Sequence, residues 1–290
     1  MRVLVSGASG YIGTELRRQL EIDGHTVLRL VRRAPEGAGE FNWAPMARML
    51  DSNLVESVDA VINLSGAPTT RMPWTGSYKK TIIESRLRST QALAEAMNMA
   101  ASPPGVFLSA SGTAYYGDRP GVRLTEQSPR GDDFLAKLAE AWEGAAAIAP
   151  AGTRVVTFRS GLVVGRGGPF GQLRALTGLG LGSRLGTGGQ HWPWISLYDE
   201  AAAIRHLLSS KLEGPVNLVG PVPATSHRVT SALANSMGRW HPLVVPEPAI
   251  RLLGDATFGA MASQKVVPER LLADGFQFRH ATVEEAIDAT

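Results

Sequence analysis

Residues 1–33 read MRVLVSGASGYIGTELRRQLEIDGHTVLRLVRR, and this stretch decides the fold. An apolar run from Val3 to Val5 predicts a buried strand, and it ends in a glycine-rich turn. The amphipathic segment from Ile12 to about Asp23 predicts a helix, and Thr26 to Val31 predicts a second strand. A strand, a tight turn, a helix and a parallel strand form one βαβ unit.

Three glycines at GxxGxxG spacing join the first strand to the helix. Gly7 allows a tight turn, Gly10 lets the backbone approach a pyrophosphate, and Gly13 lets the helix pack closely on the sheet. The free N–H groups at the start of the helix attract an anion. We therefore expect a dinucleotide site; the alternative is a glycine-rich turn without a ligand. The expected contacts here are Gly7, Ser9, Gly10, Tyr11, Ile12 and Gly13.

The end of the second strand indicates which dinucleotide is bound. An Asp or Glu about 20 residues past such a motif usually accepts a hydrogen bond from a free ribose 2′-hydroxyl. Here Val31 is followed by Arg32 and Arg33, and the next acid is Glu36. A carboxylate repels a 2′-phosphate, whereas a guanidinium binds it with two charged hydrogen bonds. We therefore expect NADP(H), with Val31 and Arg32 beside the adenosine ribose; the alternative is a solvated basic turn.

The composition limits the class of protein. Of the 290 residues, 44% are hydrophobic and 19% charged, which is typical of a globular chain. The absence of cysteine excludes disulfides and thiol nucleophiles, and agrees with a cytoplasmic location. Basic residues are scattered and the net charge is only +3, so we expect no nucleic-acid partner. No apolar run is long enough to span a membrane, and His191 lacks partners for a metal site.

Apolar segments alternate with helical ones along the rest of the chain. Further strands are expected at 59–66, 105–111 and 154–160, and helices at 77–99 and 131–149. This alternation predicts an α/β fold with a doubly wound parallel sheet, whose strands bring their carboxyl ends to one crevice. We expect a Rossmann domain in residues 1–165, to which later segments return, and a smaller substrate or lid domain in residues 166–290.

Several longer motifs resemble those of one family. GASGYIG, VDAVINLSGAP, the SAS to YYGD segment and FRSGLVVGRGG are similar to the extended short-chain dehydrogenase/reductases. RMPW, GLGSRLGTGGQHWPWI and the tail QKVVPERLLADGFQFRHATVEEAI resemble the "epimerase family" branch of NAD-dependent epimerase/dehydratase proteins, with its C-terminal extension. The resemblance covers essentially the whole chain and implies a reductase or epimerase that uses a nicotinamide cofactor and a small-molecule substrate.

The resemblance also places three residues near the cofactor. Asn63 and Leu64 end the third strand, where the family contacts the adenine-ribose and nicotinamide side. Arg86 falls where related enzymes place a polar residue beneath the cofactor. Asn63 is alternatively a turn cap, because Asx side chains satisfy local backbone groups. Arg86 is alternatively a solvated helix residue.

The catalytic positions depart from the family pattern. These enzymes use a Ser or Thr together with a Tyr and a Lys four residues apart on one face of the following helix. Lys137 is present, but Asp133 stands four residues before it, so the Tyr–Lys pair is absent. Without that tyrosine, Lys137 is expected to be a charge on the helix surface.

Ser111 and Tyr116 are the expected catalytic residues. Ser111 matches the family serine and would hold a substrate oxygen, whereas Tyr116 would supply the proton. Alternatively, Ser111 caps a turn, and the Tyr115–Tyr116 pair is one packed ring and one exposed ring. Asp118 is a weaker candidate base.

The glycine-rich stretch 178–189 predicts a lid, and the sequence His191-Trp192-Pro193-Trp194 follows it closely. Trp74, Tyr115, Trp192 and Trp194 are expected to form the walls of a substrate pocket. Ordinary packing of the lid on the sheet is the alternative for each tryptophan.

The sequence supports three hypotheses. The first is an NADP(H)-dependent reductase or epimerase that acts on a carbonyl or hydroxyl of a small organic or nucleotide-sugar-like substrate. The second is an NADP(H)-binding redox sensor without chemistry, which the missing Tyr–Lys pair would allow. The third is an interaction protein with a vestigial fold. The substrate and the oligomeric state stay open.

Overall fold

The computed structural model describes residues 1–240, 243–248 and 258–290. Its centre is a seven-stranded sheet with strand order β12-β7-β5-β4-β1-β2-β3, and every pairing in it is parallel. The strands are β1 (Arg2–Ser6), β2 (Thr26–Val31), β3 (Glu40–Asn42), β4 (Ala60–Asn63), β5 (Val106–Gly112), β7 (Arg154–Ser160) and β12 (Gly214–Leu218).

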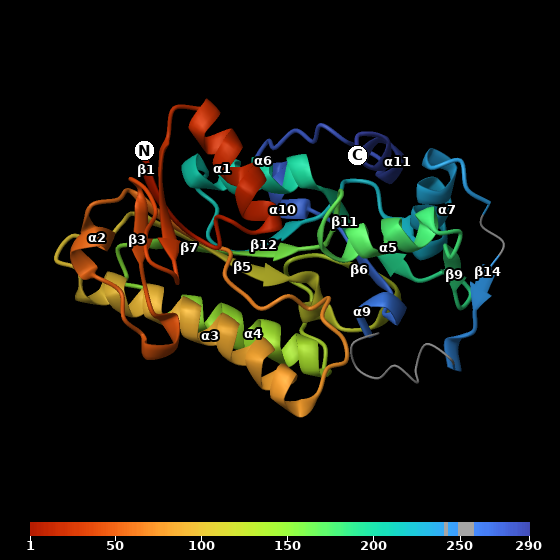
Figure 1. Cartoon of the computed structure of the whole chain (residues 1–290), viewed down its shortest axis with the longest axis horizontal. Helices are drawn as coiled ribbons and strands as arrows, with labels where there is room; N and C mark the ends of the chain where they lie inside the picture. Colours follow the sequence, from red (N-terminus) through yellow and green to blue (C-terminus); the bar gives the residue numbers. More distant parts are fainter. Residues whose placement is uncertain (241–242, 249–257) are drawn as a thin grey trace.

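Helices cover both faces of this sheet (Figure 1). α1 (Tyr11–Ile22) and α6 (Leu197–Ser209) lie on one face, and α3 (Gly76–Met99) and α4 (Phe134–Ala146) on the other. Each face buries its own apolar cluster, because neighbouring residues of a strand point to opposite sides. Val3 and Val5 therefore pack towards α1, whereas Leu4 packs on the side of α3.

The strand order reverses between β1 and β4. From β1 the chain proceeds through β2 to β3 in one direction, and β4, β5, β7 and β12 continue in the other. In such open sheets the ligand crevice lies beyond the carboxyl ends of the strands at this switch point. The expected doubly wound α/β sheet is confirmed, and its geometry places the crevice at the ends of β1 and β4.

The smaller part of the fold is built from short elements after β7 and from strand β6 (Arg119–Leu124), which precedes β7 in the chain. Its strands form two-stranded sheets. These pair β8 (Leu162–Val164) with β11 (Trp194–Ser196), β10 (His191–Trp192) with β13 (Ala224–Thr225), β9 (Ser183–Leu185) with β14 (Leu243–Val245), and β6 with β15 (Gln264–Val266). The accompanying helices are α5 (Gly168–Gly178), α7 (Ser226–Ser236), α9 (Phe258–Met261), α10 (Glu269–Ala273) and α11 (Val283–Asp288).

The segments after residue 165 return twice to the large sheet, as helix α6 and as strand β12. Hydrogen bonds hold the C-terminal residues against α6. Asp199 accepts hydrogen bonds from the backbone N–H groups of Arg279 and His280, at 2.8 and 3.1 Å. His206 Nε2 lies 2.7 Å from Asp274 Oδ2. The division into residues 1–165 and 166–290 stays a prediction.

Several observed elements differ from the expected ones, and strand β12 of the large sheet is among those that were not expected. β3 was not expected, because three residues with alternating polarity give no apolar run. α4 begins at Phe134 and not at residue 131, because Asp133 caps it. Short helical turns occur at Pro45–Ala47, α2 (Ser52–Glu56) and Thr113–Tyr116. In the part of the chain that the structure describes, no helix is long and apolar enough to cross a membrane.

Candidate functional site

The glycine turn after β1 has the close approaches that the motif predicts. Gly7 has φ of +76°, and a Cβ atom there would lie 2.8 Å from the carbonyl oxygen of Leu64. A Cβ at Gly13 would collide with the carbonyl oxygen of Gly7, so the helix can pack only if this residue is glycine. Gly10 donates its N–H to Gly7 at 2.9 Å and is the N-cap of α1.

No side chain caps the start of α1. The N–H groups of its first turn therefore remain available to an anion. A cavity of about 320 Å³ lies at this end of the helix, lined by Ser9, Gly10, Tyr11, Thr14, Glu15 and Leu197. Tyr11 lies against the glycines of the 165–168 segment, whereas Ile12 packs into the apolar cluster beneath α1. The residues present fit a dinucleotide pyrophosphate.

The two arginines after β2 have different surroundings. Arg33 forms a two-point ion pair with Glu40, with nitrogen–oxygen distances of 2.8 and 3.0 Å. Arg33 thereby lowers the pKa of Glu40 to about 2. Arg32 is exposed and makes no ion pair or hydrogen bond with the residues that the structure describes. Arg32, next to Val31, is therefore the guanidinium that is available to a ligand.

Asn63 is fully buried and its side chain is engaged within the protein. Its Oδ1 accepts hydrogen bonds from Ser6 Oγ at 2.7 Å and from the backbone of Ser65 at 3.2 Å, and its Nδ2 donates to Thr90 Oγ1 at 2.8 Å. The side chain thus connects β1, β4 and α3, and its bond to Ser65 is the turn cap that the alternative described. Contact with a cofactor would have to come from the backbone of this segment, including Leu64.

Arg86 lies in the middle of α3 and is half-buried. Its Nη1 donates to the carbonyl oxygens of Ala67 and Ile82, both at 3.1 Å. The guanidinium lies 5.0 Å from the ring centre of Trp142 on α4. Burial lowers the pKa of Arg86 to about 10. This arginine is therefore not the solvated helix residue that the alternative described.

Ser111 lies at the end of β5 and donates its hydroxyl proton to Glu143 Oε1 at 2.7 Å. Glu143, on α4, also holds Arg159 by two hydrogen bonds of 2.7 and 2.8 Å. Because the single proton of the serine is directed to a carboxylate, Ser111 can offer only lone pairs to a ligand. Sequence reasoning missed Glu143 and Arg159; an arginine inside the apolar strand 154–160 was the available signal.

Tyr116 does not reach the crevice. It is fully buried, and its hydroxyl donates to Asn217 Oδ1 at 2.6 Å and accepts from Arg159 Nη1 at 3.0 Å. Burial raises the pKa of Tyr116 to about 12, so neither position nor acidity suits the proton transfer that the sequence assigned to it. Tyr115 is half-buried, with its ring 3.4 Å from the Arg159 guanidinium and edge-on to Tyr116.

The positions of the family Tyr–Lys pair have structural roles or face solvent. Asp133 Oδ1 accepts the backbone N–H groups of Leu135 and Ala136, at 2.8 and 3.0 Å, and so caps α4. Lys137 is exposed on this helix. Asp118 accepts the backbone N–H of Ser263 at 2.8 Å, and so connects the loop before β6 to the segment before β15.

The tryptophans expected in the pocket wall are mostly core residues. Trp192 and Trp194 are buried in the apolar cluster of the smaller part. Their indole N–H groups donate to the carbonyl oxygens of Ala260 and Val222, each at 2.9 Å. Ordinary packing therefore accounts for both. Trp74 is half-buried and edge-on to Phe134, at a ring distance of 6.3 Å.

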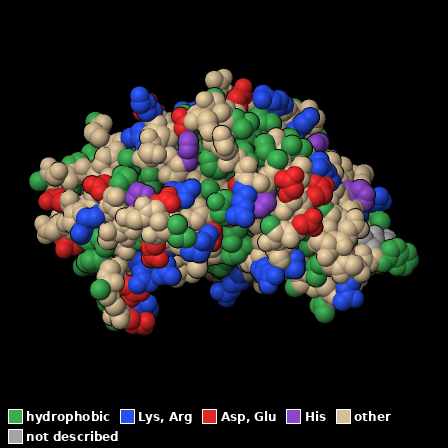
Figure 2. All heavy atoms as spheres, turned by 90° about the horizontal axis from the view of Figure 1, so that it is seen from above, with side chains coloured by type: hydrophobic (Ala, Val, Ile, Leu, Met, Phe, Trp, Pro, Cys, Tyr) green, Lys and Arg blue, Asp and Glu red, His purple; other side chains and the backbone are tan. Residues whose placement is uncertain are grey.

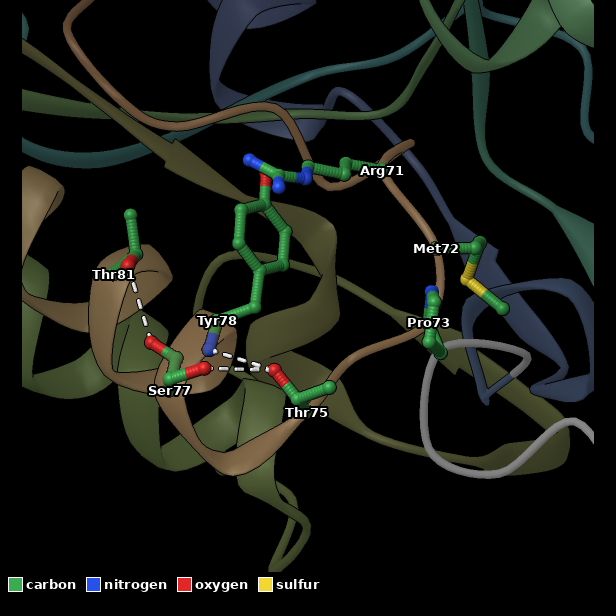
Figure 3. A pocket seen from close by; sticks show the side chains of 7 residues that line it. All are labelled: Arg71, Met72, Pro73, Thr75, Ser77, Tyr78 and Thr81. Carbon is green, nitrogen blue, oxygen red and sulfur yellow. Dashed lines mark hydrogen bonds between the residues drawn. The ribbon is translucent and has the colours of Figure 1, made fainter.

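A second cavity, of about 280 Å³, lies at the start of α3 (Figure 3). Its lining is mostly polar and comprises Arg71, Met72, Pro73, Thr75, Ser77, Tyr78 and Thr81. The Arg71 guanidinium lies 4.9 Å from the ring centre of Tyr78. Tyr78 donates its hydroxyl proton to the carbonyl oxygen of Pro68 at 2.6 Å, in the loop that follows β4. This hydrogen bond connects the wall of the cavity to the loop that follows β4.

The described residues contain no cluster of three or more His, Cys, Asp or Glu that could hold a metal ion. On the face of the molecule seen in Figure 2, Lys and Arg side chains are interspersed with Asp and Glu.

Comparisons with known proteins agree with this geometry. Residues 3–220 match the NAD dependent epimerase/dehydratase family, and residues 245–290 match a domain of unknown function, DUF1731. An epimerase family protein from Mycobacterium leprae is 39% identical over 98% of this chain and 94% of its own length. The human epimerase family protein SDR39U1 is 38% identical over 96% of this chain and 95% of its own.

Two solved structures are also similar. The crystal structure of human SDR39U1 with NADPH superposes with a TM-score of 0.91 at 35% identity, and covers 100% of this chain and 98% of its own. A nucleoside-diphosphate sugar epimerase from Corynebacterium glutamicum gives a TM-score of 0.81 at 32% identity, over 99% of this chain and 57% of its own. The chain therefore belongs to the NAD-dependent epimerase/dehydratase family and has a C-terminal DUF1731 domain.

Proposed function

We propose that the protein is an NADP(H)-dependent oxidoreductase or epimerase that acts on a carbonyl or hydroxyl group of a small organic substrate. The observation that carries this proposal is the contrast between the two arginines after β2. Arg33 is neutralised by Glu40, whereas Arg32 is exposed and has no partner among the described residues. An unpaired guanidinium at this position suits a ribose 2′-phosphate.

The other groups of the cofactor would be held along the same edge of the sheet. The start of α1, uncapped by any side chain, would hold the pyrophosphate, and Gly7 and Gly10 would let it approach the backbone. The human relative in the NADPH crystal structure shares 35% identity with this chain, which supports the same choice of cofactor. When bound, the nicotinamide would supply hydride-transfer chemistry.

Ser111 is the residue of this chain that would orient the substrate group that reacts. Glu143 fixes the serine hydroxyl, and Arg159 fixes Glu143, so the serine oxygen is held with its lone pairs free. Such an oxygen accepts a hydrogen bond from a substrate hydroxyl and orients it. It does not by itself donate a proton to a carbonyl oxygen.

A redox-sensing module is the second candidate function. It is favoured by one observation. Tyr116, which was expected to supply the proton, is buried, and the two positions of the family Tyr–Lys pair hold a helix cap, Asp133, and an exposed lysine, Lys137. A protein of this kind would bind NADP(H) tightly and turn nothing over.

The two functions are separated by a screen for NADPH-dependent reduction and NADP⁺-dependent oxidation. Purified protein is first shown to bind NADPH by calorimetry, and is then incubated with panels of carbonyl and hydroxyl compounds while absorbance of the reduced cofactor is followed. Substrate-dependent change in absorbance supports the enzyme. An epimerase regenerates its cofactor and leaves the absorbance unchanged, so inversion of each hydroxyl compound is also followed by NMR. Binding with neither absorbance change nor inversion supports the sensor, and absence of binding contradicts both.

A further inference from the structure

Glu200 is a carboxyl group sealed inside the protein. It lies on α6 and has no solvent exposure. When the carboxyl is ionised, Oε1 accepts a hydrogen bond from Ser160 Oγ at 2.5 Å, whereas Oε2 is buried with no partner among the residues that the structure describes. Because an ionised carboxylate is costly to bury without a counter-ion, burial raises the pKa of Glu200 to about 8. The group therefore keeps its proton at neutral pH.

The elements around Glu200 supply no charge that offsets this cost in the described part of the chain. α6 packs on α1, β5, β7, β8 and β11, of which β5, β8 and β11 carry no titratable side chain. The titratable groups of the others at this end of the molecule are Tyr11 and Glu15 of α1, Arg159 of β7, Tyr198 and Asp199 of α6, and His280 bonded to Asp199. None of them affects the pKa of Glu200, which burial raises and the bond from Ser160 lowers.

Ser160 lies at the carboxyl end of β7, beside an open space. Its register partner on β5 is Gly112, and both residues point to the α6 face, two positions after Phe158 and Ala110 of the apolar cluster there. A Cβ atom at Gly112 would lie 4.0 Å from the nearest atoms beyond the adjacent residues. The missing side chain therefore leaves room next to the Ser160 hydroxyl, which is half-buried, and next to Ser111 in the chain.

The strand order gives the direction in which the proposed cofactor would lie. Arg32, proposed to bind the 2′-phosphate, follows β2, and the proposed pyrophosphate site is the turn between β1 and α1. The nicotinamide would therefore extend the other way, over β4, β5 and β7. β7 is three strands from β1, about 14 Å away. Leu197 lines the cavity at the start of α1, and Glu200 follows it by one turn on the same side of α6.

The proton of Glu200 decides what Ser160 can offer to a ligand. On Oε2 that proton would have no acceptor in the described chain, and an unsatisfied buried donor is costly. On Oε1 it is donated to Ser160 Oγ, and the serine directs its own proton into the space at Gly112. Ionisation reverses this hydrogen bond, so that Ser160 donates to the carboxylate and offers only lone pairs. A neutral Glu200 therefore makes Ser160 a donor to the ligand.

We propose that Glu200 is a positioning residue for the cofactor: as an uncharged acid it donates to Ser160, and Ser160 donates in turn to the carboxamide oxygen of the nicotinamide. This inference rests on the proposed function. Ser111, at the end of the neighbouring strand, has the opposite role, because Glu143, which accepts its proton, forms an ion pair with Arg159. Bound dinucleotide would favour the protonated form of Glu200, so NADPH affinity depends on pH through this residue.

The test is the pH dependence of NADPH affinity, measured by calorimetry at constant ionic strength between pH 6.5 and pH 9.5. Glu200→Gln keeps an uncharged donor to Ser160, and Ser160→Ala removes the donor to the cofactor. Glu213→Gln, at an exposed acid, is the matched control. Infrared difference spectra between wild type and Glu200→Gln give a second readout, the carbonyl band of the protonated carboxyl group, which is followed against pH with and without NADPH.

We expect the wild-type affinity to be constant below about pH 7.5, to fall by at most tenfold per pH unit above the pKa of about 8, and to level off at least about tenfold lower. Glu213→Gln should follow the wild type. Glu200→Gln should keep the low-pH affinity within about threefold up to pH 9.5. Ser160→Ala should bind about tenfold more weakly at pH 7 and lack this pH dependence. NADPH should move the midpoint of the infrared band to higher pH.

Parallel pH profiles for wild type and Glu200→Gln, or unchanged affinity in Ser160→Ala, would overturn the inference while leaving the proposed function intact. If the wild type binds NADPH at no pH in this range, the proposed function fails and the inference fails with it. If either variant does not fold, as judged by circular dichroism, the infrared band of the wild type decides: its assignment then rests on its loss with rising pH, and a midpoint that NADPH does not move contradicts the inference.

Discussion

Arg33 and Glu40 form a two-point ion pair, with nitrogen–oxygen distances of 2.8 and 3.0 Å, across the last two strands of the sheet. Glu40 also forms an ion pair with Arg29, at 3.1 Å. One carboxylate therefore pairs with two arginines, Arg29 on β2 and Arg33 just after it. The two arginines Arg32 and Arg33, adjacent in sequence, therefore differ: Arg33 is a structural residue, whereas the guanidinium of Arg32 has no partner among the residues that the structure describes.

The phosphate loop should be sensitive to substitution at Gly10. A Cβ atom there would lie 3.1 Å from the carbonyl oxygen of Gly7, which the chain can tolerate with a small shift. The branched side chain of Gly10→Val would, however, occupy the space that a pyrophosphate needs. We expect loss of NADPH binding in calorimetry with little change in the circular dichroism spectrum. Gly37→Val, with open space around it, is the control, and normal binding by Gly10→Val would place the phosphate site elsewhere.

Removing the Tyr116 hydroxyl should cost stability and not turnover. The buried hydroxyl donates to Asn217 Oδ1 and accepts from Arg159 Nη1, and Tyr116→Phe leaves these two atoms without a partner among the described residues. We expect the free energy of unfolding in urea to fall by about 1–3 kcal/mol. Tyr115→Phe is the matched control, because its hydroxyl has no hydrogen bond among the described residues. A large loss of turnover in Tyr116→Phe without loss of stability would instead show that this tyrosine takes part in the reaction.

Ser111 stays our prediction for the residue that holds the substrate oxygen. Once a substrate is found, Ser111→Ala should reduce kcat/KM by about 10²-fold, the scale on which misplacing a reacting group by about 1 Å slows a reaction. Lys137→Ala should have little effect, because this lysine is exposed on α4. Steady-state kinetics on both variants checks this. A large effect at Lys137 with none at Ser111 would restore a mechanism closer to the usual family one.

Glu200 should make the protein less stable as the pH rises. It is fully buried on α6, accepts the Ser160 hydroxyl at 2.5 Å, and burial raises its pKa to about 8. Between the ordinary pKa of a glutamate and that value, the unfolded chain loses a proton that the folded chain keeps. The contribution to the free energy of unfolding then falls by about 1.4 kcal/mol per pH unit, and it levels off above the folded pKa.

Urea unfolding between pH 5 and pH 9 measures this effect. Glu200→Gln should remove this component of the pH dependence, whereas Glu213→Gln, at an exposed acid, should retain it. Parallel pH profiles for wild type and Glu200→Gln would show that Glu200 is not the group responsible.

Local patterns were sufficient to predict most of the sheet and the phosphate loop. The GxxGxxG turn, the apolar strands and the helical periodicity act within a few residues, so β1, α1 and β2 could be predicted from one short stretch. The family motifs also indicated that the chain departs from the usual Tyr–Lys pair.

Contacts between distant residues could not be predicted in this way. Arg33 is neutralised by Glu40 only because an unexpected strand, β3, pairs with β2. Tyr116 is buried because Asn217 arrives from β12, 101 residues later. Trp192 and Trp194 enter a core completed by the C-terminal helix α11. In each case the partner that decides the role of the side chain comes from elsewhere in the chain.

The central claim, that Arg32 selects NADP(H), is tested most directly by calorimetric affinities for NADPH and NADH in the wild type, Arg32→Ala and the matched Arg33→Ala. We predict that the wild type prefers NADPH, and that Arg32→Ala loses about 1.5–3 kcal/mol of that preference, the value of one charged hydrogen-bonded contact. Arg33→Ala should keep the preference, because Arg33 is committed to Glu40. Equal affinity of the wild type for NADPH and NADH would contradict the claim.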